Sequence, residues 1–224
     1  MKLYTGPLSL FSRKVEIALR EKGLSFEREL VAFSQVQGYQ PKHPAVLAAN
    51  PKGQVPVLVD GDLTLFDSTV IFEYLEDAYP QPALYPKGAP ARARCRLLEL
   101  TADEILLPLV CCFMHRSEPP GPDYTRRRQK EEVAVKATAE LHRHYDLLTG
   151  ELGGQDFFCG GFSVADIALF MQLLFTLRLK GPGLDSHPTL AAWYQRLLRR
   201  PTIAPIAAEI AAADRELSPA LAVS

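Results

Sequence analysis

The chain has 224 residues and a mass of 24.8 kDa, with a formal net charge of −1 and a sequence pI near 6.5. This length suits one large domain or two small ones with a buried core. The balanced charge gives no electrostatic reason to expect nucleic acid or an anionic membrane as a partner. No stretch has the roughly 18 apolar residues of a membrane span, and the N-terminus lacks the apolar segment of a signal peptide, so we expect a cytoplasmic protein.

Four cysteines are present, Cys95, Cys111, Cys112 and Cys159. They form no C-x-x-C pair and do not have the spacing of a metal site, so we expect no bound metal. All four stand in apolar stretches with helical character. We therefore expect them to behave as small buried hydrophobic residues.

Residues 1–80 carry strand and helix signals in alternation. Strands are predicted over 2–5, 26–31, 55–59 and 63–66, and helices over 10–22, 45–48 and 67–79. Gly23 follows the first helix as a C-terminal glycine commonly does, and Asp60-Gly61 is a hairpin signal between the last two strands. The order βαβ followed by ββα predicts a thioredoxin-like α/β domain.

Two details of this half indicate ligand chemistry. Pro56 lies early in a predicted strand, where the backbone of Val55 is left free to pair with something else and a cis turn is accessible. Asp67 and Ser68 stand at a helix N-terminus, which suits a carboxylate, and their side chains suit the zwitterionic end of an amino acid. Each detail also has a plain structural interpretation, an edge-strand proline and an ordinary helix cap.

The string NPKGQVPVLVDGDLTLFDS, residues 50–68, with the helix after it, resembles the glutathione-binding half of the cytosolic glutathione transferases. It is closest to their serine-type classes, and its residues resemble those of the phi class most. The resemblance implies that the backbone of Val55, before Pro56, pairs with the cysteinyl part of glutathione. It also implies that Asp67 and Ser68 hold the γ-glutamyl end, although the phi pattern usually has Glu at the position of Asp67.

Two further residues resemble glutathione contacts of the family. Lys42 resembles a lysine that reaches the glycyl carboxylate of glutathione, and Gln54 resembles a glutamine that contacts the same peptide. Lys42 is also explained as an exposed lysine that contacts only solvent. Gln54 lies inside the string that carries the resemblance.

Ser9 is the candidate catalytic residue. In SLFSRKVEIAL it stands where the family's S-P-F-x-x-x-V segment begins, with Leu10 in place of the common proline. A hydrogen bond to a charged group is worth roughly 1.5–3 kcal/mol and a helix N-terminus about 0.3–1, which together lower a thiol pKa by about one to three units. We therefore expect Ser9 to donate a hydrogen bond to the glutathione thiolate. Ser12 is the alternative, although inside the first helical turn its hydroxyl is expected to serve local capping.

A serine-hydrolase function is not indicated. No G-x-S-x-G surrounds any serine. The five histidines, at 43, 115, 142, 144 and 187, form no recognisable constellation with Ser9. We interpret them as surface or packing residues.

Residues 81–90 are rich in proline and are predicted to link the domain of residues 1–80 to an all-α domain of residues 91–224. Helices are predicted over 91–116 with a kink at Pro108, and over 126–152, 163–179, 187–199 and 202–213. Ser163 and Asp166 form a capping-box-like pair before a helix that is almost entirely apolar, so we assign them a folding role. Trp193 is expected to pack in this domain.

The resemblance covers nearly the whole chain and implies a detoxifying enzyme that conjugates glutathione, its co-substrate, to small apolar electrophiles. It implies a homodimer and no further cofactor. Two alternatives remain open: isomerisation of a maleyl-type compound or peroxide reduction at the same site, and a non-catalytic binding or scaffold protein. The electrophile is expected near Leu8, Leu10, Phe11, Leu109, Phe113 and Arg116.

Overall fold

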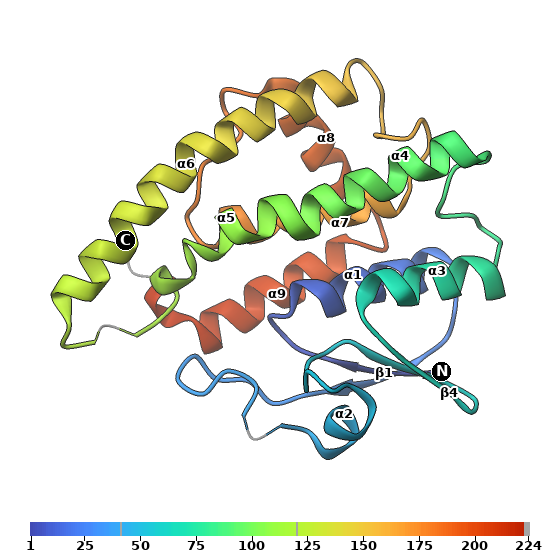
Figure 1. Cartoon of the computed structure of the whole chain (residues 1–224), viewed down its shortest axis with the longest axis horizontal. Helices are drawn as coiled ribbons and strands as arrows, with labels where there is room; N and C mark the ends of the chain where they lie inside the picture. Colours follow the sequence, from blue (N-terminus) through green and yellow to red (C-terminus); the bar gives the residue numbers. More distant parts are fainter. Residues whose placement is uncertain (41, 120, 222–224) are drawn as a thin grey trace.

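The computed structural model describes residues 1–40, 42–119 and 121–221, and Figure 1 shows a small sheet at the base with helices stacked above it. In this part of the chain the strands are β1 (Lys2–Thr5), β2 (Glu27–Leu30), β3 (Val57–Asp60) and β4 (Leu63–Phe66). They form a mixed sheet in the order β2-β1-β3-β4, in which β1 and β2 are parallel and β3 is antiparallel to β1 and β4. The predicted βαβ and ββα order is confirmed.

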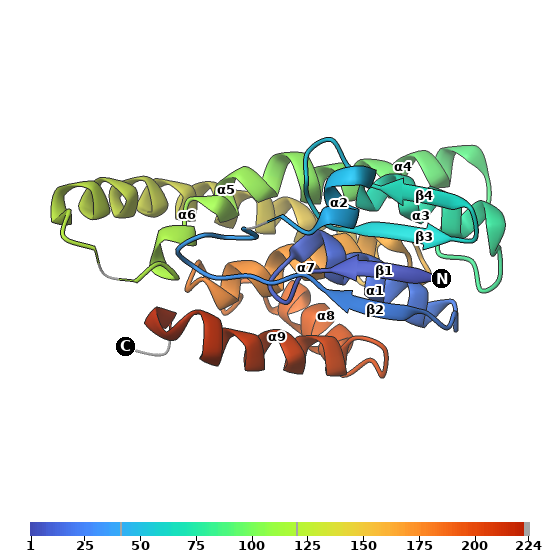
Figure 2. The same ribbon diagram turned by 90° about the horizontal axis from the view of Figure 1, so that it is seen from below.

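Three helices belong to this half, α1 (Leu10–Glu21), α2 (Pro44–Ala49) and α3 (Ser68–Ala78). Helices α1 and α3 lie on the sheet face that is turned to the rest of the molecule, and α2 lies on the opposite side (Figures 1 and 2). The hairpin turn differs by one residue from the prediction. Asp60 pairs with Leu63, so the turn residues are Gly61 and Asp62. Gly61 has a φ of +57°, which glycine adopts without strain.

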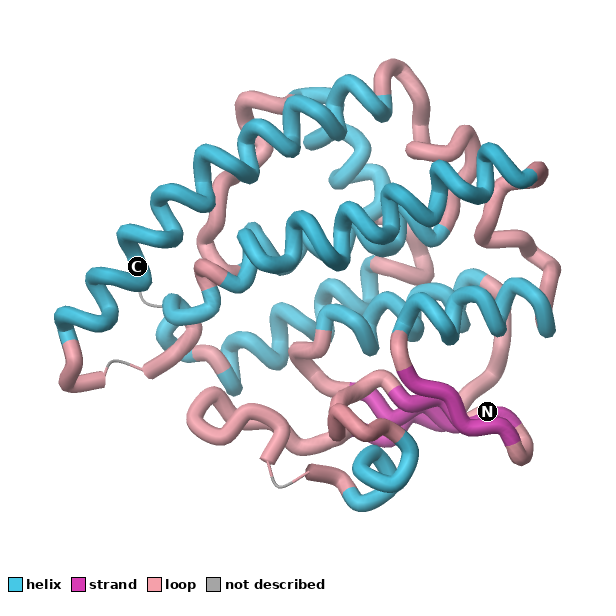
Figure 3. Tube along the Cα trace, in the orientation of Figure 1, coloured by secondary structure: helices cyan, strands magenta, loops and turns pink. Residues whose placement is uncertain are grey.

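The remainder of the described chain is helical (Figure 3). Its elements are α4 (Ala89–Leu100), the π-helical turn η1 (Thr101–Leu106), α5 (Leu107–Cys111), η2 (Met114–Arg116), α6 (Tyr124–Leu152), α7 (Val164–Arg178), α8 (Pro188–Leu198), α9 (Ala204–Leu217) and η3 (Pro219–Leu221). The predicted continuous helix over 91–116 is therefore interrupted by η1. Pro108 lacks the N–H that a regular helix would bond to the carbonyl of Glu104, and the π turn directly precedes this break.

Helix α7 is the buried centre of the helical half, and Asp166 organises its N-terminus. The Asp166 carboxylate accepts hydrogen bonds from the backbone N–H of Ser163 at 3.0 Å and of Phe158 at 3.2 Å, and from Nε1 of Trp193 at 3.0 Å. The predicted capping box at Ser163 is confirmed. Trp193 is fully buried, as expected for a residue that packs in this half.

The cysteines differ from the prediction that all are buried. Cys95, in the middle of α4, is buried, but Cys111 is exposed and Cys112 and Cys159 are partly exposed. Cys111 and Cys112 lie at the end of α5 and Cys159 lies in the loop before α7, where fewer neighbouring elements cover a side chain. In the part of the chain that the structure describes, no helix is long and apolar enough to cross a membrane.

Candidate functional site

Two neighbouring cavities lie where the sheet half meets α4, η1 and α5. The polar cavity, of about 560 Å³, is lined by the loop before β3, the start of α3 and acidic residues of α4 and η1. The apolar cavity, of about 490 Å³, is lined by the start of α1, residues 33–39, Lys42, α5 and the end of α7. Phe11, Gln54, Val55 and Leu107 line both cavities and define the junction between them.

The loop before β3 forms one wall of the polar cavity. Asn50 is buried and fixes this loop, because its amide donates to the carbonyl of Gln54 at 2.7 Å and its oxygen accepts from the N–H of Lys52 at 2.9 Å. The Val55–Pro56 peptide bond is cis, and β3 begins only after it. The hydrogen bonds among the described residues leave the N–H and C=O of Val55 unused, as the sequence predicts.

The start of α3 forms the second wall. Asp67 is the N-cap, and its Oδ1 accepts from the N–H of Thr69 at 3.0 Å and of Val70 at 3.4 Å. Asp67 has a φ of +76°, a conformation that costs a non-glycine residue of order 1–3 kcal/mol and that is concentrated at functional sites. Ser68 follows on the cavity wall, nearly buried, and its hydroxyl has no partner among the described residues.

Acidic residues of the helical half complete the polar cavity, and the sequence analysis did not identify them. Thr69 donates to Glu99 at 2.9 Å, and Lys14, which is fully buried, donates to Oδ2 of Asp103 at 2.5 Å. Oδ1 of Asp103 is buried with no partner among the described residues. Burial raises the pKa of Asp103 although Lys14 opposes this effect, and the charge of Asp67 raises it further. Asp67 and Asp103 thus place two carboxyl groups near one another.

Ser9 lies at the edge of the apolar cavity and is the N-cap of α1. Its Oγ accepts hydrogen bonds from the backbone N–H of Ser12 at 3.3 Å and from the hydroxyl of Ser12 at 3.0 Å. A hydroxyl oxygen has two acceptor positions and one proton, so both acceptor positions of Ser9 are filled and its proton is left to donate elsewhere. Ser12 is fully buried beneath it. As expected, Ser12 lies inside the first turn of α1 and its hydroxyl serves the local cap, because it donates to the N-cap residue Ser9.

The apolar cavity contains only part of the predicted electrophile site. Leu8, Leu10 and Phe11 line it, together with side chains of α5 and α7. Phe113 is instead fully buried in the hydrophobic core, and neither Leu109 nor Arg116 lines the cavity. Arg116 pairs with Glu131 and donates to the carbonyl of Lys180. The π turn explains the error, because its extra residue rotates the face of α5 and turns Leu107, Val110, Cys111 and Met114 towards the cavity.

Two cationic side chains line the mostly apolar cavity. Lys42 lies there with its aliphatic stem next to Gly53. Arg178, at the end of α7, is held by Asp214 at 2.5 Å and stacks over the ring of Phe175. Lys42 was predicted as a site residue, whereas Arg178 was not, because no local motif marks it.

Comparison with known proteins agrees with this architecture. A family model described as the glutathione S-transferase N-terminal domain matches residues 3–83, and one described as the C-terminal domain matches residues 101–201. Glutathione S-transferase 3 of Zea mays is 32% identical over 210 residues, which is 90% of each chain. This chain therefore belongs to the cytosolic glutathione transferase superfamily.

Other relatives match only part of the chain. A stringent starvation protein A homolog of Coxiella burnetii is 42% identical over 100 residues, 44% of each protein. A maleylacetoacetate isomerase of Pseudomonas aeruginosa is 46% identical over 97 residues, 43% of this chain and 45% of that protein. Among solved structures, a sphingomonad glutathione S-transferase in complex with glutathione superposes with a TM-score of 0.73 at 27% identity, covering 94% of this chain and 99% of that one.

Proposed function

We propose that this protein binds glutathione in the polar cavity and conjugates its thiolate to small apolar electrophiles held in the apolar cavity. The observation that carries this proposal is the hydroxyl of Ser9, which caps α1 beside the junction with both acceptor positions filled. The thiolate of a glutathione bound at the junction accepts this hydrogen bond, which lowers the pKa of the thiol so that its proton is released to solvent. The thiolate then attacks the electrophilic carbon, forming the S–C bond as the leaving group departs.

The charges around the polar cavity suggest how glutathione lies. The free backbone groups of Val55 pair with the cysteinyl residue, and the hydroxyl of Ser68 with the N-terminus of α3 binds the γ-glutamyl carboxylate. The carboxylates of Asp67 and Asp103 bind the γ-glutamyl ammonium group. At the other end of glutathione, Lys42 in the adjoining apolar cavity binds the glycyl carboxylate. Gln54, at the junction of the cavities, contacts the same peptide. The similarity to the maize transferase and to the sphingomonad enzyme solved with glutathione supports glutathione as the ligand.

We propose that the protein acts as a homodimer in the cytoplasm and needs no cofactor besides glutathione. Large apolar side chains are exposed along α3, α4 and η1: Val70 at 49%, Leu97 at 62%, Leu100 at 49% and Ile105 at 42%. Leu97 and Leu100 stand three residues apart on α4 and so share one face. A second copy would cover this face, and sedimentation should then give twice the chain mass, with Leu97→Arg shifting the protein towards the monomer.

Two measurements test the central proposal. Calorimetric titration with glutathione should show one site per chain, and an aromatic halide should be conjugated to glutathione in a reaction that Ser9→Ala slows. A matched control is Ser186→Ala, because Ser186 is an exposed residue away from both cavities. If glutathione does not bind, the enzyme assignment fails and a non-catalytic binding or scaffold role is favoured.

A second candidate reaction is the isomerisation of a maleyl-type compound. The specific observation is that Arg178 lines the apolar cavity, where its guanidinium suits an acceptor substrate with a carboxylate group. The partial similarity to a maleylacetoacetate isomerase points in the same direction. An assay that compares an aromatic halide with a maleyl substrate distinguishes the two reactions, because only the isomerisation returns glutathione unchanged.

A further inference from the structure

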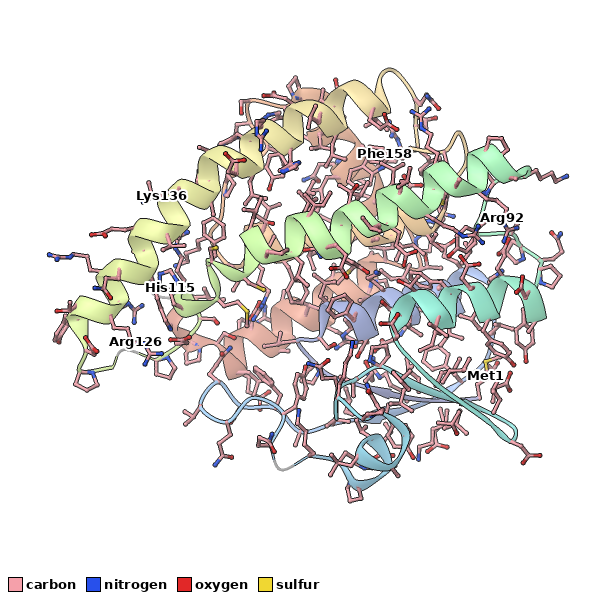
Figure 4. The ribbon with its side chains drawn as sticks, viewed as in Figure 1. Met1, Arg92, His115, Arg126, Lys136 and Phe158 are labelled. Atoms are coloured by element: carbon pink, nitrogen blue, oxygen red, sulfur yellow. The ribbon has the colours of Figure 1, made fainter. Side chains whose placement is uncertain are left out.

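A surface groove lies next to the apolar cavity, where the end of α5 and η2 meet the first turns of α6. It has a volume of about 330 Å³, and Figure 4 labels two of its lining residues, His115 and Arg126, which lie near each other there. Cys111 and Met114 line both the groove and the apolar cavity. Both residues are exposed, so no buried wall separates the two hollows.

The groove carries apolar surface that the described part of the chain leaves exposed. More than half of the surface of Met114, on η2, and of Val133, on α6, is open to solvent. Contiguous exposed apolar surface on a soluble protein commonly marks a binding groove. The two sides are fixed to each other by His115, whose ring lies 3.0 Å from the carbonyl oxygen of Cys112 and 2.8 Å from the carboxylate of Glu131 on α6. The groove is therefore an apolar extension of the cavity with a fixed shape.

The charges along the groove favour an anionic group at the α6 side. Arg126 and Lys130 line it from α6, and Glu118 lines it from the loop after η2. Lys130 pairs with Glu118 at 2.8 Å, which offsets this carboxylate. Asp123 accepts the backbone N–H of Arg126 at 2.9 Å, and the guanidinium of Arg126 has no ion-pair partner among the described residues. Arg126 is thus the cation that remains to bind a carboxylate.

We propose that the apolar cavity and the groove together bind one elongated acceptor, an unsaturated aldehyde with a long alkyl chain that ends in a carboxylate. The electrophilic carbon lies beside Ser9, the chain passes over Cys111 and Met114 along Val133, and the carboxylate meets Arg126. An alkyl chain has no aromatic leaving group, so its electrophilic carbon is that of a conjugated carbonyl. Because the chemistry is the conjugation proposed above, this assignment rests on that function.

The reaction is an addition. The sulfur of the glutathione thiolate bonds to the β-carbon of the acceptor, the π bond between the α- and β-carbons breaks, and the α-carbon takes a proton from solvent. No group leaves. The length of the chain therefore affects the rate only through binding in the groove.

The first test measures kcat/KM for glutathione addition to 2-alkenals of about six to fourteen carbons, each ending in a methyl group or in a carboxylate. The value should rise by about two- to fourfold for each methylene that enters the groove. Among the long members, those with a carboxylate should react about two- to fivefold faster at low salt, because the ion pair with Arg126 is exposed.

Four variants locate the effect. Val133→Asp places a charge in the groove and should remove the gain with chain length, whereas Val135→Asp, exposed on the same helix but outside the groove, should keep it. Arg126→Gln should remove only the preference for a carboxylate, and Arg128→Gln should keep it. An aromatic halide should react alike in all four variants, because none of these residues lines either cavity.

Binding without turnover separates this proposal from the proposed function. Dodecanoate should bind the native chain, compete with the halide and bind more weakly to Val133→Asp. A native chain that conjugates the halide but shows no gain with chain length, or a Val133→Asp variant that keeps the full gain, would overturn the proposal alone. If the halide is not conjugated, the proposed function fails, and equal binding of dodecanoate by the native chain and Val133→Asp would then overturn the groove as well. A change of sedimentation mass in Val133→Asp would assign the groove to an interface between copies and also overturn the proposal.

Discussion

The polar and apolar cavities are adjacent but are built in different ways. The sheet-side wall of the polar cavity comes from one continuous stretch, residues 50–69, and uses main-chain groups and a helix N-terminus. The apolar cavity is assembled from α1, α5, α7, residues 33–39 and Lys42, and its character depends on side chains. Main-chain recognition is insensitive to substitution, so it suits a single fixed ligand. A pocket lined with side chains changes with each substitution, so it suits a second substrate that differs between relatives.

The largest effect is expected at the boundary between the two cavities. Ser9→Ala removes the proposed donor to the thiolate, so turnover at pH 7 should fall by about 10- to 100-fold, and the pH at which turnover appears should rise by about one to two units. Glutathione affinity should remain near that of the native chain, because Ser9 contacts only the sulfur. The measurement is the pH dependence of kcat/KM with an aromatic halide, beside calorimetric titration of both proteins.

The buried Ser12 provides the matched control for Ser9. Ser12→Ala removes one hydrogen bond into the Ser9 oxygen but leaves the Ser9 proton available. The pH profile should therefore move by less than in Ser9→Ala. A profile that stays in place in Ser9→Ala and moves in Ser12→Ala would contradict the assignment of Ser9 and transfer the role to Ser12.

Ser68→Ala should weaken glutathione binding without altering the second substrate's site. The lost hydrogen bond to a charged carboxylate is worth about 1–3 kcal/mol, which corresponds to roughly 5- to 150-fold in Kd. The KM for the electrophile should be unchanged at saturating glutathione, because Ser68 lines only the polar cavity. Thr64→Ala, on the exposed strand β4, is a suitable control. Equal affinity of Ser68→Ala and the native chain would remove Ser68 from the site.

The same contrast explains which site residues the sequence could predict. Val55, Pro56, Asp67 and Ser68 are predictable because a turn, a proline and a helix cap are local signals, and all four line the polar cavity. The βαβ and ββα order is readable for the same reason. Asp103 carries no such signal, since its place in the polar cavity exists only after the helical half packs on α1, where Lys14 binds it.

The apolar cavity could not be predicted because it depends on helix register. An uninterrupted helix over 91–116 would direct Leu109 and Phe113 to the same side as one another, and the sequence analysis placed both at the electrophile. The π turn η1 changes the register of everything after it, so Leu107 and Val110 line the cavity and Phe113 enters the core. Pro108 marks the interruption in the sequence, but it does not specify a π turn or the resulting rotation.

Asp103→Asn tests the contribution of the helical half to the polar cavity. A neutral amide cannot pair with the γ-glutamyl ammonium as an ion, so affinity at pH 7 should fall by about tenfold. Burial raises the pKa of Asp103 above the ordinary value of 3.8, so in the native chain affinity should decline as the pH falls through this raised pKa. The asparagine variant should lack that decline. Calorimetric titration across the acid range measures both, with Asp77→Asn, at an exposed residue that lines neither cavity, as the control.

An unchanged affinity in Asp103→Asn would limit glutathione recognition to the sheet half. Because Lys14 loses its nearer carboxylate partner in this variant and keeps only Glu99 at 3.6 Å, the melting temperature of the variant should be measured first. A folded variant that keeps the native affinity and the native decline of affinity at low pH would then contradict the role of Asp103. A lower affinity at pH 7 together with loss of that decline would support it.

Arg178→Gln should have the smallest and most selective effect. Asp214 already pairs with the guanidinium, so only part of its charge acts on the apolar cavity. For an acceptor with carboxylate groups kcat/KM should fall by a few-fold, corresponding to about 1 kcal/mol, whereas a neutral aromatic halide should react as before. The comparison of the two substrates in the native chain and the variant is the measurement. An equal fall for both would mean that Arg178 only supports the fold of α7 and α9, and the isomerase candidate would lose the side chain that favours it.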